Sequence, residues 1–384
     1  MATALQLKEK GDYPVSVIEA EKEIASHQTG NNSGVIHSGL YYKPGSLKAK
    51  NCVDGRERLY RFCEVNNIKY EKCGKIVVAV EEWEIPLLKM LEERGTANGI
   101  KGIKRLRGDE LKEYEPHTSG IAGLFVPETG IVDYKAVTEK YSNIFQSKGG
   151  EVKLECRFLS LKEKNNRLIL ETTGGELQCS LLVNCGGLYS DRIARKCGAR
   201  PSLQIIPFRG EYYKLKKEKE YLVKSLVYPV PDPKFPFLGV HFTRMMRGGV
   251  EAGPNAVLAF KREGYSRSDI SVKDVLQMVS FPGFWKMAAK HYKMGFKEYY
   301  RSLSKTAFVR SLQKLIPEIT EEDIVPGGAG VRAQALERDG NLTDDFRIVE
   351  TEKVIHVLNA PSPAATASLS IGDKISELII KRLY

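Results

Sequence analysis

The stretch HQTGNNSGVIHSGLYYKPGSLKAK, residues 27–50, is dense in glycine, asparagine and serine. Residues of these types interrupt regular secondary structure, so the stretch is predicted to be a long structured loop. A helix carrying Leu59, Phe62 and Cys63 is expected to follow it. Long ordered loops inside a folded domain are usually functional. The loop is therefore the first candidate for a ligand-binding segment.

The segment before this loop has the order helix, turn, strand and acid. Residues 1–10 are predicted to be the later part of a helix, and residues 15–18 a short strand that ends at Glu19. In a dinucleotide-binding βαβ unit, a strand-end carboxylate binds the ribose about 20 residues after the Gly-rich turn. Counting back from Glu19 places that turn before Met1. A solvated acid after an ordinary strand explains Glu19 equally well.

The rest of the chain alternates between strand and helix signals. The apolar run SLLVNC, residues 180–185, leads into Gly186 and Gly187 and is typical of a strand in a buried parallel sheet. The other predicted strands are residues 75–80, two within 120–132, 152–161, 167–172, several within 205–252, and 353–358. The other predicted helices are residues 82–94, 137–148, most of 273–315, and 363–382.

This order of elements predicts an α/β protein with two interleaved domains. One is a Rossmann-like nucleotide-binding domain whose first strand and Gly-rich loop are missing. The other is a substrate domain made of an antiparallel β-sheet plus helices. The first is expected to comprise residues 1–74, 135–204 and 325–384, and the second residues 75–134 and 205–324.

Composition favours a soluble protein that handles anions. The 384 residues are 42% hydrophobic and carry a formal net charge of +11, but lysine and arginine are spread among 48 acids. That spread argues against nucleic-acid binding and suits an anionic substrate or an acidic membrane surface. No apolar run is long enough to span a membrane, and residues 1–30 lack a signal-peptide pattern.

The cysteines and histidines give no sign of a disulfide framework or a metal site. The seven cysteines include no C-x-x-C pair, and the six histidines are scattered. Free thiols are typical of a reducing compartment, so a cytoplasmic location, peripheral to a membrane, is expected. A mitochondrial location is expected instead if the chain is eukaryotic and a targeting segment precedes Met1.

Long motifs carry a family resemblance. NNSGVIHSGLYY, with His37, resembles the loop and the His-small-Gly signature of the glycerol-3-phosphate dehydrogenase and glycine oxidase superfamily of flavoproteins. The whole of residues 27–50 is more similar to L-2-hydroxyglutarate dehydrogenases. So are PFRGEYY (207–213), FPFLGVHFTR (235–244), GPNAVLAFKREGY (253–265), AGVRAQALERDG (329–340) and NAPSPAAT (359–366).

The resemblance implies an FAD enzyme that oxidises L-2-hydroxyglutarate to 2-oxoglutarate and passes the electrons to an acceptor other than NAD. Two alternatives stay open. The chain could be a shortened, non-catalytic remnant that does not bind FAD, or an amine or amino-acid oxidase on the same fold. In-frame codons for a strand and G-x-G-x-x-G upstream of Met1 would favour the active enzyme over the remnant.

Hydride removal from C2 needs a base for the hydroxyl proton, and imidazole titrates near neutral pH. His37 and His241 lie in the resembling motifs and are the candidate bases.

The two substrate carboxylates are expected to be bound by arginine, whose planar fork binds a carboxylate with two hydrogen bonds. Arg332 in AGVRAQ is the stronger candidate and Arg209 in PFRG the weaker. Tyr41 and Asn255 are candidate wall residues, with a structural role favoured.

The resemblance also indicates which residues hold the cofactor. The loop residues Thr29, Gly30, Asn32 and Ser33 match the segment that runs under FAD in the family. Glu19 is the ribose candidate. Backbone next to a ligand is expected at Cys185, Gly186 and Gly187, and at the predicted start of the last helix, Ser362, Ala364 and Thr366.

The stretch FWKMAAKHYKMGFKEYYRSLSK, residues 284–305, mixes aromatic and basic residues. It is a candidate for contact with a membrane surface near a quinone or other electron-transfer acceptor. A helix with a packed aromatic face and a solvated basic face is the favoured alternative.

Overall fold

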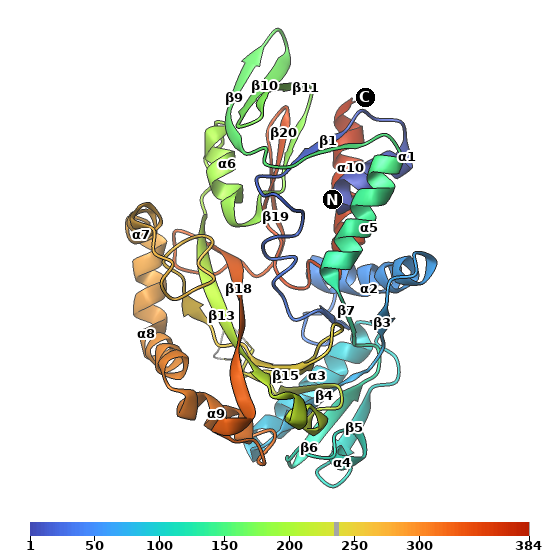
Figure 1. The fold of residues 1–384 in the computed structure, drawn as a ribbon, viewed down its shortest axis with the longest axis vertical. Helices are drawn as coiled ribbons and strands as arrows, with labels where there is room; N and C mark the ends of the chain where they lie inside the picture. Colours follow the sequence, from blue (N-terminus) through green and yellow to red (C-terminus); the bar gives the residue numbers. More distant parts are fainter. Residues whose placement is uncertain (234–237, 384) are drawn as a thin grey trace.

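The computed structural model describes residues 1–233 and 238–383. The first three residues of the motif at 235–244 lie outside the described residues. In Figure 1 the molecule has an upper half built on short parallel strands and a lower half built on a large sheet. Two long strands, β13 (Gln204–Leu215) and β18 (Ile324–Leu336), run from the upper half into the lower one.

The upper half contains two parallel strand pairs. β1 (Ser16–Ile18) pairs with β8 (Glu151–Lys153), and β12 (Leu182–Asn184) pairs with β20 (Val354–Asn359), whose other edge holds β19 (Arg347–Glu350). Among the described strands, β1 and β12 are each paired along one edge only. The predicted α/β class is confirmed, and the Rossmann-like part is present as two separate small sheets, one parallel and one mixed.

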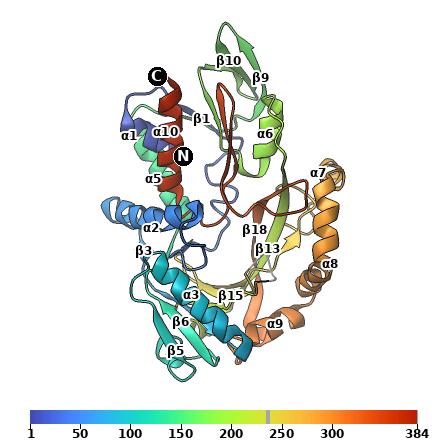
Figure 2. The ribbon, with the colours of Figure 1, turned by 180° about the vertical axis from the view of Figure 1, so that it is seen from behind.

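Helices α1 (Ala2–Lys10), α2 (Leu47–Val65), α5 (Tyr134–Ser147) and α10 (Ser368–Leu383) lie on one side of these strands (Figures 1 and 2). Gly372 of α10 permits close packing on α1, because a Cβ there would come within 2.8 Å of the Ala2 carbonyl carbon. Above the strands is an antiparallel meander of β9 (Phe158–Lys164), β10 (Arg167–Thr172) and β11 (Gly175–Cys179).

The lower half is a nine-stranded sheet within the described residues. β13 pairs with β18 along most of its length, and the sheet continues through strands that are mostly antiparallel. One pair, β14 with β4, is parallel. The remaining strands are β16 (Val250–Gly253), β15 (His241–Arg244), β14 (Leu226–Pro229), β4 (Lys75–Ala79), β6 (Ala122–Val126), β5 (Lys104–Arg107) and β17 (Val257–Leu258). A small sheet, β2 (Val35–Ile36), β7 (Gly130–Val132) and β3 (Tyr70–Glu71), joins the two halves.

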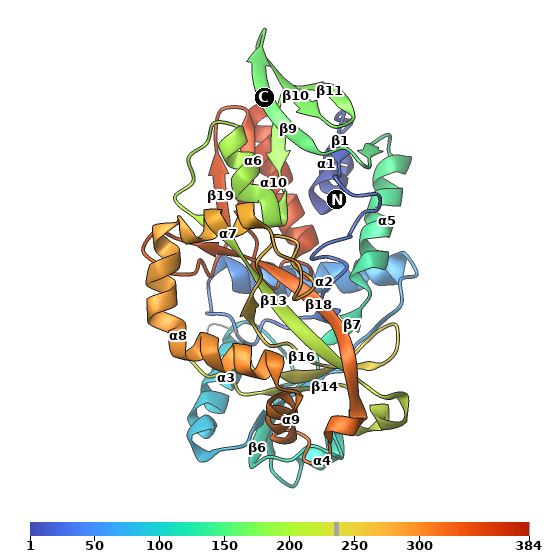
Figure 3. The same ribbon diagram turned by 60° about the vertical axis from the view of Figure 1, so that its left-hand side comes forward.

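Strand β4 shows how the large sheet is covered on both faces. Ile76 and Val78 pack in a core with residues of α9 (Lys305–Gln313), whereas Val77 and Ala79 pack with α3 (Ile85–Ala97). This alternation is the period of two expected for a strand. Helices α7 (Val272–Val279) and α8 (Pro282–Leu303) continue the cover along the outer side (Figure 3). Short helical segments complete the fold: η1 (Glu82–Glu84), α4 (Leu111–Tyr114), η2 (Gly187–Tyr189), α6 (Ser190–Lys196), η3 (Lys217–Leu222) and η4 (Glu321–Asp323).

Three expectations about element bounds differ from the structure. The strand expected at 152–161 is split into β8 and β9, because the chain turns at Glu155, where φ is 53°. The last helix begins at Ser368 rather than at 363, and residues 362–367 form turns around Pro363, which has no N–H to donate. The domain boundary expected at residue 325 falls inside β18.

A buried ion pair ties the two halves together. Arg262, in the segment after β17, donates to both carboxylate oxygens of Asp191 on α6, at 2.7 and 2.9 Å. Both side chains are almost completely buried, so each compensates the desolvation of the other. Among the described helices, none is long and apolar enough to cross a membrane.

Candidate active site

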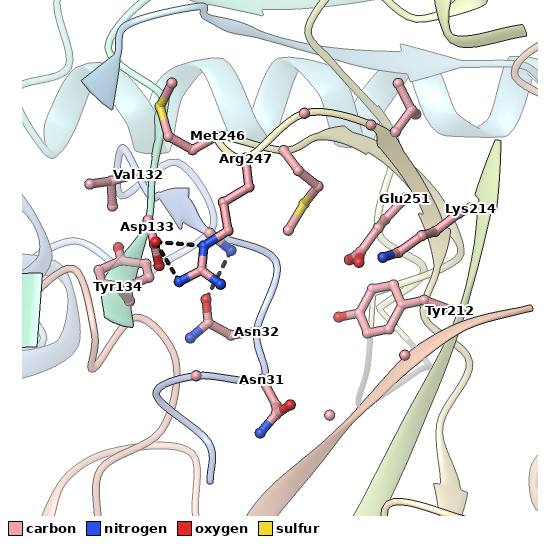
Figure 4. A pocket seen from close by; sticks show the side chains of 18 of the residues that line it. Asn31, Asn32, Val132, Asp133, Tyr134, Tyr212, Lys214, Met246, Arg247 and Glu251 are labelled. Carbon is pink, nitrogen blue, oxygen red and sulfur yellow. Dashed lines mark hydrogen bonds and ion pairs between the residues drawn. The ribbon is translucent and has the colours of Figure 1, made fainter. Parts of the chain in front are cut away.

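A cavity of about 310 Å³ lies between the predicted ligand-binding loop and the large sheet (Figure 4). On one wall Arg247 reaches across to Asp133, with 2.6 Å between Arg247 Nε and the nearer carboxylate oxygen. The opposite wall carries Tyr212, Lys214 and Glu251. The rest of the lining comes from residues 29–34, 132–134, 245–251 and 328–330.

Glycines shape the loop side of this cavity. A Cβ on Gly30 would lie 2.2 Å from the Ala25 carbonyl oxygen, and one on Gly330 would lie 2.7 Å from that of Asn31. Gly34 has a φ of 66°, which side chains rarely adopt. A Cβ on Gly328 would meet no atom within 4 Å. Gly30 and Gly330 therefore permit the close approach of backbone segments around the loop, and only Gly328 of these positions has open space next to it.

The structure gives Asn32 a role in shaping the loop. Its side-chain amide donates to the carbonyls of Gln28 and Thr29, and its side-chain oxygen accepts from Gly34 N–H at 2.8 Å. Thr29 and Gly30 line the cavity, and Ser33 lies between the cavity-lining Asn32 and Gly34. The predicted cofactor loop thus holds its own shape through internal hydrogen bonds.

A second group of predicted residues meets at the start of α1. Cys185, which follows β12, and Glu19, which follows β1, both lie close to Met1, the residue before α1. Gly187 approaches the loop, because a Cβ there would lie 3.0 Å from Gln28 Oε1. The two strand ends therefore meet at a helix N-terminus, a location that favours anionic groups. The Gly186 N–H donates to Asn184 Oδ1 at 3.0 Å.

The segment before the last helix also lies next to the loop. The Thr366 hydroxyl accepts a hydrogen bond from His37 N–H at 3.1 Å and lies 2.8 Å from Tyr134 Oη. The expectation that residues 362–366 form a helix N-terminus is wrong, because Ser362, Ala364 and Thr366 belong to the turns before Ser368. Thr366 is buried and links the loop to the C-terminal segment.

His37 and His241 share one electrostatic environment, and neither is among the described residues that line the cavity. Burial is the main cause that lowers the pKa of each to about 3. Lys75 lowers both further, and Arg332 lowers that of His241. Both imidazoles are therefore neutral at neutral pH, and the chain brings His37, His241 and Arg332 together from three distant segments.

The tautomer of His241 follows from one contact. Its Nδ1 lies 2.8 Å from the carbonyl oxygen of Gly239. A carbonyl can only accept, so Nδ1 carries the proton and Nε2 keeps a lone pair. The ring also packs against Tyr228, with 3.9 Å between centroids and 31° between the ring planes. His241 is thus held as a proton acceptor in a fixed orientation.

The two candidate arginines differ in their surroundings. Arg332, on β18 opposite Phe208 of β13, is half-buried, and burial lowers its pKa, while the neighbouring Tyr212 raises it. Arg209 is almost fully buried and donates to Glu211, with 2.9 Å between Nη2 and the carboxylate. Asn255 hydrogen-bonds Glu211 twice. Its side-chain oxygen accepts from the Glu211 backbone N–H, and its side-chain N–H donates to the Glu211 carboxylate. Arg209 and Asn255 thus belong to an internal polar network centred on Glu211.

Sequence reasoning missed three residues of this region, Lys75, Tyr212 and Tyr228. Lys75 begins the strand KIVVA and is almost completely buried. A lysine at the head of an otherwise apolar, buried strand is the signal that could have identified it. The two tyrosines lie in strands that are buried along most of their length, so the sequence alone does not single them out.

Comparison with known proteins agrees with this geometry. The profile of the family described as FAD dependent oxidoreductase matches residues 1–378. The chain is 57% identical to the L-2-hydroxyglutarate dehydrogenase of Indibacter alkaliphilus, covering 100% of this chain and 96% of that one. It is 48% identical to the mitochondrial L-2-hydroxyglutarate dehydrogenase of Homo sapiens, covering 96% and 83%. It is 46% identical to that of Escherichia coli K12, covering 98% and 89%.

Solved structures with the same fold are more distant in sequence. L-alpha-glycerophosphate oxidase from Mycoplasma pneumoniae, with FAD bound, superposes with a TM-score of 0.79 at 20% identity, covering 99% of this chain and 91% of that one. Glycine oxidase from Geobacillus kaustophilus gives a TM-score of 0.72 at 15% identity, covering 99% and 91%. At these identities the likeness concerns the fold.

Proposed function

The chain belongs to the FAD dependent oxidoreductase family, as one of its L-2-hydroxyglutarate dehydrogenases, and on that premise we propose which residues carry out the oxidation. The enzyme converts the C2 hydroxyl of L-2-hydroxyglutarate to the carbonyl of 2-oxoglutarate. The observation that supports the residue roles is the meeting of a neutral His241, His37 and Arg332 in one electrostatic environment. Tyr212, which interacts with Arg332, lines the cavity and connects this group to it.

The residues around the cavity fit FAD. The open space at Gly328 leaves room for a flat ring system, and the α1 N-terminus with Glu19 suits the phosphate and ribose part. We assign the loop of residues 29–34 and residues 328–330 to the ring, and Glu19, Cys185 and Gly187 to the nucleotide half. Bound FAD supplies the acceptor for the hydride from C2.

The protein's own groups bind the substrate and move its proton. Arg332 holds the carboxylate next to C2 through its planar fork, which orients the C2–H bond. His241 Nε2 accepts the hydroxyl proton as the carbonyl forms. The substrate is a dianion, and its negative charge raises the pKa of the imidazole from its low value in the empty site. Substrate binding therefore makes His241 a stronger base when it is needed.

The proposed function is tested by dye-linked turnover with product identification. The purified chain, supplied with FAD and a reducible dye, is expected to convert L-2-hydroxyglutarate to 2-oxoglutarate and to leave the D-isomer unchanged. Glycine and L-proline serve as amine substrates on the same dye. Turnover of an amine in place of the hydroxy acid would identify an amine oxidase. Retained fold without turnover of any substrate would identify a non-catalytic remnant.

We further propose that electrons leave at a membrane surface on which α8 lies. Trp285, Tyr292, Phe296, Tyr300 and Leu303 are all exposed and follow a spacing of seven, four, four and three residues, which places them on one face of the helix. Four exposed lysines lie along one side of this stripe: Lys286, Lys290, Lys293 and Lys297. Aromatic and basic residues combined in this way are typical of helices that bind anionic bilayers.

Replacing Phe296, which is 74% exposed, with serine is expected to weaken binding to phosphatidylglycerol-containing vesicles about tenfold. Burying such a side chain contributes about 1.5–3 kcal/mol, and ~1.4 kcal/mol is tenfold in affinity. Co-sedimentation with vesicles measures the effect. Tyr221, 61% exposed on η3, is the matched control, and its replacement with serine should change nothing. Equal loss in both variants, or no binding by the parent chain, would contradict the proposal.

A further inference from the structure

Lys75 is a buried cation that the proposed reaction has so far left unused. It is 1% exposed and begins β4, opposite Val126 of β6. Since side chains alternate along a strand, Lys75 faces the same side of the sheet as Val77 and Ala79. An isolated ammonium group in such a place is strongly unfavourable unless something compensates its charge.

The described residues provide no anion for this ammonium group. The ammonium group lies over two aromatic rings. Lys75 Nζ is 4.3 Å from the centroid of the Tyr41 ring and 5.1 Å from that of the Tyr228 ring. Within residues 1–233 and 238–383, no carboxylate, carbonyl or hydroxyl is recorded as its hydrogen-bond acceptor. The buried hydroxyl of Tyr41 also has no hydrogen-bond partner there. The ammonium group of Lys75 and the hydroxyl group of Tyr41 are thus both available to hydrogen-bond a ligand.

The charged and titratable groups around Lys75 favour an anionic ligand. His37 and His241 are neutral, and the pKa of the Cys52 thiol is raised by burial to about 12, so none of them supplies negative charge. The groups that interact with Lys75 or with the two histidines come from the loop, α2, β14, β15 and β18: His37, Tyr41, Lys48, Cys52, Tyr228, His241 and Arg332. This set contains cations and neutral groups but no carboxylate.

We propose that Lys75 and Tyr41 bind the C5 carboxylate of the substrate, the one remote from the reacting carbon, while Arg332 binds the carboxylate at C1. This inference rests on the proposed function and deepens it. A dicarboxylate then neutralises two cationic positions, whereas a monocarboxylic 2-hydroxy acid leaves Lys75 uncompensated. Lys75 therefore determines the preference for dicarboxylic substrates.

Binding of a carboxylate next to Lys75 changes the protonation of its amine. Burial lowers the pKa of Lys75 to about 7, so near that pH a part of the empty protein holds a neutral amine. A carboxylate that arrives next to it favours the charged form and raises the pKa. Binding of a dicarboxylate is therefore coupled to proton uptake near neutral pH, and this uptake disappears well below the pKa, where the amine is already charged.

The test measures binding rather than turnover. Calorimetry with glutarate, a dicarboxylate without the reactive hydroxyl, is run in buffers of different ionisation enthalpy to count protons. Butyrate, which lacks the second carboxylate, is the matched monocarboxylate. The parent protein is expected to bind glutarate about 10²-fold more tightly than Lys75→Met does, and the two should bind butyrate equally. Lys75→Arg should recover most of the glutarate affinity without the proton uptake, because arginine stays charged.

Misfolding does not obscure the result. Methionine removes a buried charge and keeps a similar length, so the melting temperature of Lys75→Met should not fall below that of the parent. Equal glutarate affinity in the parent and Lys75→Met would overturn the proposal, as would an equal loss of butyrate affinity. If the parent oxidises L-2-hydroxyglutarate yet Lys75→Met binds glutarate unchanged, only the Lys75 assignment fails. If the parent neither oxidises the hydroxy acid nor binds glutarate, the proposed function itself fails.

Discussion

Replacing Arg332 with methionine is expected to lower kcat/KM for L-2-hydroxyglutarate by about 10³-fold. Removing one partner of a desolvated, hydrogen-bonded charge pair costs about 4 kcal/mol, and ~1.4 kcal/mol is tenfold in rate. Arg332 is half-buried on β18 and lies beside Tyr212 and His241, so a carboxylate bound there is largely withdrawn from water. Steady-state kinetics with a dye acceptor measure the loss.

Two further variants distinguish the effect of the paired guanidinium donors of Arg332 from the effect of its positive charge. Arg332→Lys keeps a cation but not the two parallel donors, so it should recover only part of the activity. Arg338→Met removes an exposed arginine six residues farther along and should leave kcat/KM unchanged. A loss of only a few-fold in Arg332→Met would show that the substrate carboxylate is bound elsewhere.

Replacing His241 with asparagine should lower kcat by about 10³-fold while KM changes little, because a positioned general base contributes about 10²–10⁴-fold. Asparagine can keep the hydrogen bond to the Gly239 carbonyl but offers no basic lone pair. The same replacement of His37, whose ring has no hydrogen bond recorded within the described residues, should lower kcat less. Rapid-mixing measurement of the reductive half-reaction isolates this step.

The pH profile provides the control for the His241 assignment. The parent enzyme should lose activity on the acid side as His241 becomes protonated in the substrate complex, and His241→Asn should lack this limb. An acid limb that persists in His241→Asn but vanishes in His37→Asn would transfer the role of base to His37.

The sequence predicted the segments of the site better than the contacts within it. The loop of residues 27–50 was identifiable because glycine, asparagine and serine interrupt regular elements, and its residues 29–32 and 34 line the cavity. The stretch is not all loop, because Val35–Ile36 form β2 and α2 begins at Leu47. The strand-end position of Glu19 was identifiable because a short apolar strand precedes it. Both are local patterns, which is the kind of information that a single sequence carries.

What the sequence could not supply is the pairing of distant residues. Arg332 and Arg209 both lie in strands that contain glycine, yet β13 places Arg209 beside Glu211, whereas Arg332 lies beside Tyr212 and His241. The sequence also did not predict that the Thr366 hydroxyl contacts His37 and Tyr134, each more than two hundred residues away. Such contacts depend on strand register and tertiary packing, which periodicity does not report.

The burial of Lys75 is a second feature that the sequence alone does not predict. Its strand was predicted from residues 75–80, KIVVAV, but the lysine itself was not singled out. It is buried because β14 and β6 flank β4 on both edges and the rings of Tyr41 and Tyr228 lie over its ammonium group. Burial of a strand end depends on its neighbours in the sheet, and these become known only with the fold.

The most direct test of this account is an absorbance titration of the purified 384-residue protein under anaerobic conditions. We expect a flavin spectrum that is bleached by L-2-hydroxyglutarate and unaffected by the D-isomer. That result would show cofactor, substrate and stereochemistry in one experiment. A protein that remains colourless after incubation with FAD, or a flavin spectrum that L-2-hydroxyglutarate does not bleach, would contradict the conclusion that this chain binds FAD and oxidises L-2-hydroxyglutarate.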